Sequence, residues 1–148
     1  MRATDFPGIE IKGLISYYRF QEKGEGVLRK KVLIVEDVAD VRMMMKILIQ
    51  THGFETITAR DGYEAVEQAK KYQPDIILMD LMMPVMDGFT ATRLIREHAE
   101  LKEIPILAIT AYSDTCNGKV LEVGFNDVLS KPLEFENLKP LLNQYIVD

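Results

Sequence analysis

The sequence predicts a three-layer α/β protein, in which five parallel strands form a doubly wound sheet covered by helices on both faces. Two patterns support this fold class. Five short apolar runs alternate with five amphipathic stretches along residues 31–148, and such alternation is typical of parallel sheets with crossover helices. Several of the runs are also apolar at consecutive positions, as expected for strands buried on both faces.

Each predicted strand is a short run bounded by polar or turn-forming residues. The clearest lies at 76–79, where four apolar residues follow Pro74-Asp75 and lead to Asp80. Pro84 and the pair Asp87-Gly88 then break the chain before the next helix. The five predicted strands are residues 32–35, 54–59, 76–80, 105–109 and 127–130.

The predicted helices are marked by apolar residues three and four positions apart. The first carries a stripe at positions 41, 44, 45, 48 and 49, and Gly53 follows its end. Its residues Met43, Met44 and Met45 are expected to form core and flank of the helix rather than a partner groove. The other predicted helices are 62–72, 88–98, a weak one at 114–123, and a last one with its stripe at 138–146.

Composition indicates one globular domain with a proper core. The chain has 148 residues, 47% of them hydrophobic and 28% charged, which is typical of soluble proteins. Its net charge of −5 argues against a general nucleic-acid or membrane-binding surface. No apolar run approaches the roughly 20 residues of a membrane span, and no signal peptide is recognised. The single cysteine, Cys116, excludes an internal disulfide. We therefore expect a cytoplasmic protein.

Residues 1–30 differ from the regular domain at 31–148. Apolar and aromatic residues are scattered over positions 9–20, and residues 21–31 are polar and basic with two glycines, as in a linker. We expect a loosely attached N-terminal extension and linker. A remnant of an upstream element and an arm that docks on a partner stay open, as does whether the domain stands alone or belongs to a longer chain.

Five polar residues fall at the carboxyl ends of predicted strands. Glu36 and Asp37 follow the first strand, Asp80 ends the third, Thr110 follows the fourth, and Lys131 follows the fifth. The carboxyl ends of parallel strands share one edge of the sheet, where open α/β sheets bind their ligands. We therefore expect three carboxylates, a hydroxyl and an ammonium group to converge at this edge.

The charges of these residues indicate their chemistry. Three adjacent carboxylates raise one another's pKa unless a cation lies among them, and oxygen ligands without His or Cys suit Mg²⁺. Lys131 and Thr110 can hold phosphoryl oxygens by charge and by hydrogen bond. Asp80 is a carboxylate nucleophile of the kind that forms aspartyl phosphates. The pattern therefore predicts a magnesium-dependent phosphoryl acceptor.

Taken together, the motifs resemble the receiver domain of the two-component response-regulator family, in its chemotaxis-regulator-like form. The matching segments are Val-Glu-Asp at 35–37, Met-Asp-Leu-Met-Met-Pro-Val-Met-Asp-Gly at 79–88, Ile-Thr-Ala at 109–111 and Leu-Ser-Lys-Pro-Leu at 129–133. The resemblance implies a flavodoxin-like (βα)5 fold with strand order 2-1-3-4-5. It also implies phosphorylation of Asp80 by a phosphohistidine of a sensor histidine kinase or histidine phosphotransfer domain.

The resemblance also implies roles for the site residues. Thr110 and Lys131 would hold the phosphoryl oxygens, with Thr110 moving toward them upon phosphorylation. The protein would be no turnover enzyme, since it would catalyse only its own phosphorylation and slow dephosphorylation. The implied Mg²⁺ ligands are Glu36, Asp37, Asp80 and the backbone carbonyl of Met82.

One departure from the family concerns the switch. The family has Tyr or Phe three residues before the lysine, where this chain has Val128, and the nearest aromatic is Tyr112, two residues after Thr110. Neither Met82 nor Tyr112 offers a carboxylate or amide that could orient water, and both are large enough to obstruct it, so we expect slow loss of the phosphoryl group. Output is expected on the exposed face of the fourth helix, fifth strand and fifth helix. A downstream protein would dock there, on a monomer or a phosphorylation-dependent dimer.

Other interpretations of the same residues are less favoured. Taken singly, Asp80 is compatible with a helix cap and Lys131 with a solvated surface residue. A cofactor binder of the flavodoxin type would offer backbone amides to a phosphate, where Glu36-Asp37 would repel it. A magnesium-dependent phosphatase needs an acid or base for its second step, and the second Asp of the best-known such family is Met82 here.

Overall fold

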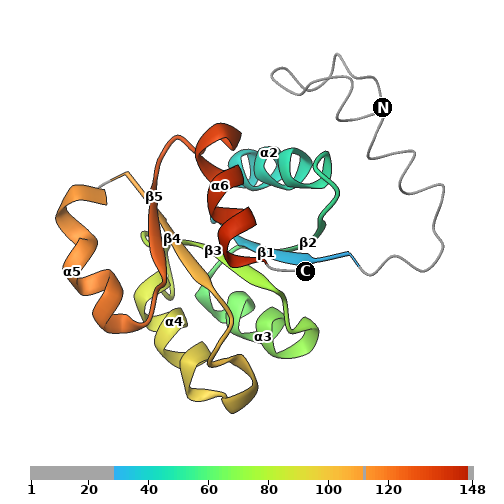
Figure 1. The fold of residues 1–148 in the computed structure, drawn as a ribbon. Helices are drawn as coiled ribbons and strands as arrows, with labels where there is room; N and C mark the ends of the chain where they lie inside the picture. The colour runs from blue at the N-terminus through green and yellow to red at the C-terminus, as the bar shows by residue number, and fades with distance from the viewer. Residues whose placement is uncertain (1–28, 112, 147–148) are drawn as a thin grey trace.

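The computed structural model describes residues 29–111 and 113–146. Five parallel strands form one sheet in the order β2-β1-β3-β4-β5, which confirms the expected α/β class and the strand order 2-1-3-4-5 (Figure 1). The strands are β1 (Lys31–Val35), β2 (Glu55–Ala59), β3 (Ile76–Asp80), β4 (Ile106–Thr110) and β5 (Asp127–Ser130).

Helices cover both faces of the sheet, as the alternation of elements requires. Helices α2 and α6 pack on one face, while α3, α4 and α5 pack on the other (Figure 1). The helices are α2 (Ala39–Gln50), α3 (Gly62–Tyr72), α4 (Gly88–Glu97), α5 (Ser113–Val123) and α6 (Phe135–Tyr145). A short 3-10 helix, η2 (Ala99–Leu101), follows α4 and was not indicated by the sequence pattern.

The central strands are buried on both faces because side chains alternate along a strand. In β1, Leu33 and Val35 pack under α3 and α4, while Val32 and Ile34 pack under α2 and α6. All five residues of β3, including Asp80, are buried. A carboxylate is therefore placed at the end of a fully apolar strand, where it requires compensating contacts.

The three methionines of α2 do not all follow the sequence prediction. Met45 is buried, as a core position requires, but Met43 and Met44 are 54% and 52% exposed. The spacing of apolar residues places a stripe on a helix, but it does not define how far the neighbouring elements cover it. The first helix therefore presents more apolar surface than its sequence suggested.

Some predictions fall on residues outside the described ranges. Tyr112 is one of them, and so is the expected N-terminal extension up to residue 28. Among the described residues, no helix combines the length and apolar character that crossing a membrane needs.

Candidate functional site

The predicted polar residues meet at the carboxyl edge of the sheet, on four adjacent strands. Glu36 and Asp37 follow β1, Asp80 ends β3, Thr110 ends β4, and Lys131 follows β5. The register explains their proximity, since β1 pairs with β3, β3 with β4, and β4 with β5. Glu36, Asp80 and Thr110 are at most 3% exposed, so the site is set into the edge of the core.

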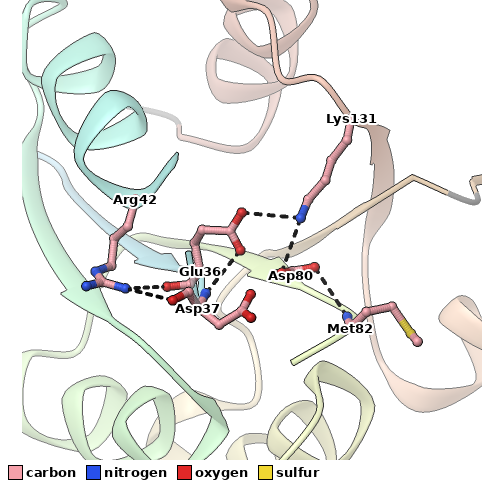
Figure 2. Close-up of polar contacts among 6 residues, drawn as sticks. All are labelled: Glu36, Asp37, Arg42, Asp80, Met82 and Lys131. Atoms are coloured by element: carbon pink, nitrogen blue, oxygen red, sulfur yellow. Dashed lines mark hydrogen bonds and ion pairs between the residues drawn. The ribbon is translucent and has the colours of Figure 1, made fainter. Parts of the chain in front are cut away.

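Lys131 joins the two buried carboxylates of the site. Its ammonium Nζ lies 3.2 Å from Oε1 of Glu36 and 3.2 Å from Oδ2 of Asp80 (Figure 2). Oδ2 of Asp80 accepts no hydrogen bond, so the lysine charge is its main compensation among the described residues. The other oxygen, Oδ1, accepts a hydrogen bond of 3.2 Å from the backbone N–H of Met82.

Glu36 and Asp37 are held by a short turn after β1. The backbone N–H of Asp37 donates to Oε2 of Glu36 at 3.0 Å. Arg42, one turn into α2, donates through Nη1 to the carbonyl oxygen of Glu36 at 2.8 Å and that of Asp37 at 3.5 Å (Figure 2). The sequence did not indicate Arg42 as a site residue. It lies on a helix rather than at a strand end, and it binds backbone carbonyls, which residue types do not reveal.

The acidic cluster fits a hard cation. Glu36, Asp37 and Asp80 each offer a carboxylate oxygen, and these oxygens all lie within 4.8 Å of one another. Magnesium holds oxygen ligands at about 2.0–2.1 Å in an octahedron, so two of its ligands are separated by roughly 3–4 Å. The compact oxygen-only set includes one buried oxygen that accepts no hydrogen bond within residues 29–111 and 113–146, and it therefore suits Mg²⁺ better than a softer metal.

The electrostatics of the metal-free site are unfavourable for Glu36. Burial, followed by a hydrogen bond with Asp80 and the negative charge of Asp80, raises the pKa of Glu36 from 4.5 to about 7, although Lys131 opposes the change. For Lys131, burial acts to lower the pKa, but the charges of Asp80 and Glu36 outweigh it and raise the pKa above its usual value. Lys131 therefore stays charged, and Glu36 is the group that a bound cation would relieve.

The loop after Asp80 is fixed by close backbone approaches. Gly88, the first residue of α4, leaves no room for a side chain, because a Cβ there would clash with the carbonyl oxygen of Asp80. The N–H of Gly88 donates to the carbonyl of Leu81 at 3.1 Å. On the other side, the N–H of Gly62 donates to the carbonyl of Met86 at 3.2 Å. The loop that carries Met82 is thus held at both ends.

The remaining predicted residues lie around this centre. Met82 is 67% exposed on the surface of the loop. Val128 is half-buried and packs against the core under α4 and α5, so a small aliphatic side chain stands where the family has an aromatic ring. Thr110 is 2% exposed, and its carbonyl accepts the backbone N–H of Lys131 at 3.0 Å.

Comparison with known proteins agrees with this architecture. Residues 32–143 match the model of the response regulator receiver domain. The polar-differentiation response regulator DivK of Brucella ovis is 32% identical over 122 residues, which are 82% of this chain and 99% of that protein.

Solved structures give the same picture. The chemotaxis protein CheY4 of Vibrio cholerae superimposes with a TM-score of 0.76 at 35% identity, covering 80% of this chain and all of that one. The receiver domain of the Pseudomonas aeruginosa sensor histidine kinase PA1611 has a TM-score of 0.74 at 32% identity, over 80% of this chain and 98% of its own. That structure holds a magnesium ion in its active-site cleft. The chain therefore belongs to the family of response regulator receiver domains.

Proposed function

We propose that this receiver domain accepts a phosphoryl group from a phosphohistidine onto Asp80, in a reaction that requires Mg²⁺. Receiver domains of two-component systems accept phosphoryl groups and interact with histidine kinases or phosphotransfer proteins. The observation that carries the assignment to Asp80 is its placement. It is a buried carboxylate at a strand end, with one oxygen that accepts no hydrogen bond from the described part of the chain and lies 3.2 Å from the Lys131 ammonium.

The transfer is a displacement at phosphorus. A carboxylate oxygen of Asp80 forms a bond to phosphorus, while the bond between phosphorus and the histidine nitrogen breaks and leaves its electron pair on that nitrogen. Most of the catalysis is positioning and charge stabilisation, because phosphoryl transfer needs little covalent help from the protein. The backbone N–H of Met82 helps to position the Asp80 carboxylate for the transfer, because it already donates a hydrogen bond to Oδ1.

Positive charge at the transferred group would come from two sources. Lys131 would pair with a phosphoryl oxygen in place of part of its present contact with Asp80. Mg²⁺ supplies a second positive charge when bound, and Glu36, Asp37, Asp80 and the Met82 carbonyl are the residues that would hold it. Thr110, which ends the neighbouring strand β4, would donate its hydroxyl to the phosphoryl group.

The protein acts in this proposal as a phosphoryl carrier, with no turnover of an external substrate. A phosphatase would need a group near Asp80 that activates water, and the exposed side chain at the second position after it is that of Met82. Output would use the face formed by α5, β5 and α6, the predicted fourth helix, fifth strand and fifth helix. Leu121 of α5 is 65% exposed and lies on this face.

The test is phosphorylation by a small-molecule donor such as acetyl phosphate, with and without Mg²⁺, followed by intact-mass measurement. We expect the wild-type protein to gain one phosphoryl group only with Mg²⁺, and Asp80→Asn to gain none. Asp87→Asn is the matched control, because Asp87 lies on the same loop and caps α4 through Thr90, a role that Asn fills equally well. Equal labelling of Asp80→Asn and wild type would overturn the assignment.

A further inference from the structure

Helix α2 starts just after the two acids Glu36 and Asp37, and it starts without a side-chain cap. Its N-cap residue is Val38, whose side chain accepts no hydrogen bond. By contrast, α3 and α4 follow Asp61 and Asp87, whose carboxylates each accept a backbone N–H of the first helical turn. The turn that carries the two acids of the site therefore depends on another contact to fix its backbone.

Arg42 supplies this contact from one turn into the helix. Its Nη1 donates to the carbonyl oxygen of Glu36 at 2.8 Å and lies 3.5 Å from the carbonyl oxygen of Asp37. Its backbone N–H donates to the carbonyl oxygen of Val38 at 2.9 Å. The side chain is half-buried, as expected for a guanidinium held in one place. A single residue thus binds the carbonyl oxygens of three successive residues of the turn.

The peptide group between Glu36 and Asp37 is held at both of its polar atoms. Its oxygen accepts the hydrogen bond from Arg42, and its N–H donates to Oε2 of Glu36 at 3.0 Å. The preceding N–H, that of Glu36, donates to the carbonyl of Ala59 in β2 at 3.0 Å, which ties the turn to the sheet. Rotation of the peptide group would break the first two contacts together. It would also redirect both carboxylates, because the two side chains leave the backbone on either side of this group.

The charge of Arg42 cannot by itself favour a metal ion. Figure 2 shows Arg42 and Lys131 on opposite sides of the two acids, where Lys131 pairs with carboxylates and Arg42 binds backbone oxygens. A second positive charge beside the acidic cluster repels a cation and lowers its affinity. Any gain in metal affinity that Arg42 provides therefore comes from the geometry of the turn, and the two effects have opposite signs.

We propose that Arg42 is a positioning residue of the metal site, which fixes the spacing of Glu36 and Asp37 and thereby favours Mg²⁺ over Ca²⁺. Mg²⁺ requires a near-ideal octahedron with ligands at about 2.0–2.1 Å, whereas Ca²⁺ accepts about six to eight oxygens at roughly 2.3–2.6 Å in flexible arrangements. A fixed turn suits the stricter ion, and a loosened turn still suits the more tolerant one. This inference rests on the magnesium requirement of the proposed function.

The selectivity is tested on the full chain by titrating Mg²⁺ and Ca²⁺ separately and following the backbone amide signal of Met82 by NMR. This amide donates to Asp80 and makes no contact with Arg42 among the described residues, so it reports on the metal site alone. Arg42→Met keeps the aliphatic stem and removes every donor. We expect it to weaken Mg²⁺ binding about tenfold, as when a residue that orients metal ligands is lost, and Ca²⁺ binding by less than about twofold. Unchanged or tighter Mg²⁺ binding, or an equal loss for both cations, would overturn the proposal.

Two further variants separate geometry from charge. Lys46→Met removes the same charge one turn further along α2 and should leave both dissociation constants within about twofold of the wild type. Arg42→Lys keeps the charge but replaces the planar fork with a single ammonium on a flexible stem. We expect it to weaken Mg²⁺ binding several-fold, in the same direction as Arg42→Met. Wild-type affinities in Arg42→Lys, or a tenfold loss in Lys46→Met, would overturn the positioning role.

Hydrogen exchange in the metal-free protein gives a readout that needs no cation. The amide of Asp37 should exchange several-fold faster in Arg42→Met than in the wild type, while the amide of Glu36, bound to Ala59 in the sheet, keeps its rate. Equal exchange of Asp37 in the two proteins would overturn the positioning role. A wild type that binds no Mg²⁺ would overturn the metal requirement of the proposed function and the selectivity with it. A wild type and Arg42→Met that bind Mg²⁺ equally well would overturn the role of Arg42 alone.

Discussion

Nζ of Lys131 lies 3.2 Å from Oδ2 of Asp80, an oxygen that accepts no hydrogen bond from the described residues. The same ammonium lies 3.2 Å from Glu36, so one cation separates two buried carboxylates. An isolated buried charge is costly, and this contact therefore stabilises the unmodified site while keeping a cation ready for a phosphoryl oxygen.

The first prediction concerns the pH dependence of stability. In the metal-free protein the pKa of Glu36 is about 7 against an ordinary value of 4.5. The folded state therefore holds a proton that the unfolded state releases, and the free energy of unfolding should fall as pH rises from 4.5 to 7. We expect this group to contribute a loss on the order of 2 kcal/mol, measured by urea denaturation in the presence of EDTA.

Glu36→Gln provides the control for this effect. The amide has the shape of the protonated carboxyl group but does not titrate. The free energy of unfolding of the variant should therefore change much less between pH 5 and 7 than that of the wild type. Saturating Mg²⁺ should reduce the decline in the wild type, because metal binding favours the charged carboxylate. A wild type whose stability rises over this range would contradict the role of Glu36.

A second prediction concerns Asp37. Its carboxylate lies within 4.8 Å of those of Glu36 and Asp80, so without metal it adds repulsion to the site. Asp37→Asn should raise the free energy of unfolding by roughly 0.5–1 kcal/mol in EDTA, a modest gain because the residue is half-exposed. The same substitution should abolish the stabilisation that Mg²⁺ gives the wild type. Thermal melts with and without metal measure both effects.

Asp40→Asn is the matched control for that experiment. Asp40 is an exposed acid in the first turn of α2, outside the three-carboxylate cluster. The Asp40→Asn variant should keep the stabilisation that Mg²⁺ gives the wild type. A clear loss of stability of Asp37→Asn in EDTA would show that the cluster is not under the repulsion argued here.

The sequence was sufficient for the fold because each strand and helix has its own periodicity. The run 76–79 is apolar at every position and forms β3, which is buried throughout. Even the weak pattern at 114–123 corresponds to α5 (Ser113–Val123). Convergence of Glu36, Asp80 and Lys131 also followed from the sequence, because parallel strands bring their carboxyl ends to one edge.

Contacts between segments distant in the chain could not be predicted from the sequence pattern. Met43 and Met44 share the apolar character of Met45, but only Met45 packs in the core cluster to which α6 contributes Leu138 and Leu142. The contact of Arg42 with the carbonyls of the β1–α2 turn depends on a backbone shape that residue types do not specify. Such features are set by tertiary packing, for which helix periodicity carries no information.

Arg96 is the strongest example and supplies a third prediction. Its guanidinium donates to the carbonyls of Gly124, 2.8 Å from Nη2, and Ile104, 2.6 Å from Nη1, and to Oδ1 of Asn126 at 2.9 Å. That amide oxygen also accepts the N–H of Ile106, so Arg96 joins α4 to the loops before β4 and β5.

Removing this guanidinium leaves several carbonyls without a donor. Arg96→Met keeps much of the aliphatic stem, and we expect a loss of about 2–4 kcal/mol in the free energy of unfolding. Arg93→Met, an exposed position on the same helix, should change it by less than about 0.5 kcal/mol. Equal losses in the free energy of unfolding for the two substitutions, measured by chemical denaturation, would reject the stabilising role of the Arg96 hydrogen bonds.

The last prediction concerns the lifetime of the phosphoryl group. Hydrolysis of an aspartyl phosphate needs a water molecule aligned with the bond that breaks. Met82 follows Asp80 by two residues. Its backbone N–H donates to Asp80, and its side chain is exposed on the loop. It has no carboxylate or amide to orient water, and we expect its bulk to obstruct the approach. We therefore expect slow self-dephosphorylation in the wild type and several-fold faster decay in Met82→Asn, whose amide can hold a water.

The decay is followed after loading Asp80 with acetyl phosphate, removing the donor and measuring intact mass over time. Adding Tyr112→Glu to Met82→Asn should quicken it further, since a carboxylate two residues after Thr110 offers a second group to bind water. Met43→Asn is the control: it replaces an equally exposed methionine on α2, away from the loop, and should leave the decay unchanged. If wild type and the double variant lose the phosphoryl group at the same rate, shielding by Met82 and Tyr112 does not set the lifetime. The signal would then be limited by a step that both proteins share, such as the strength of the contact between Lys131 and the phosphoryl oxygens.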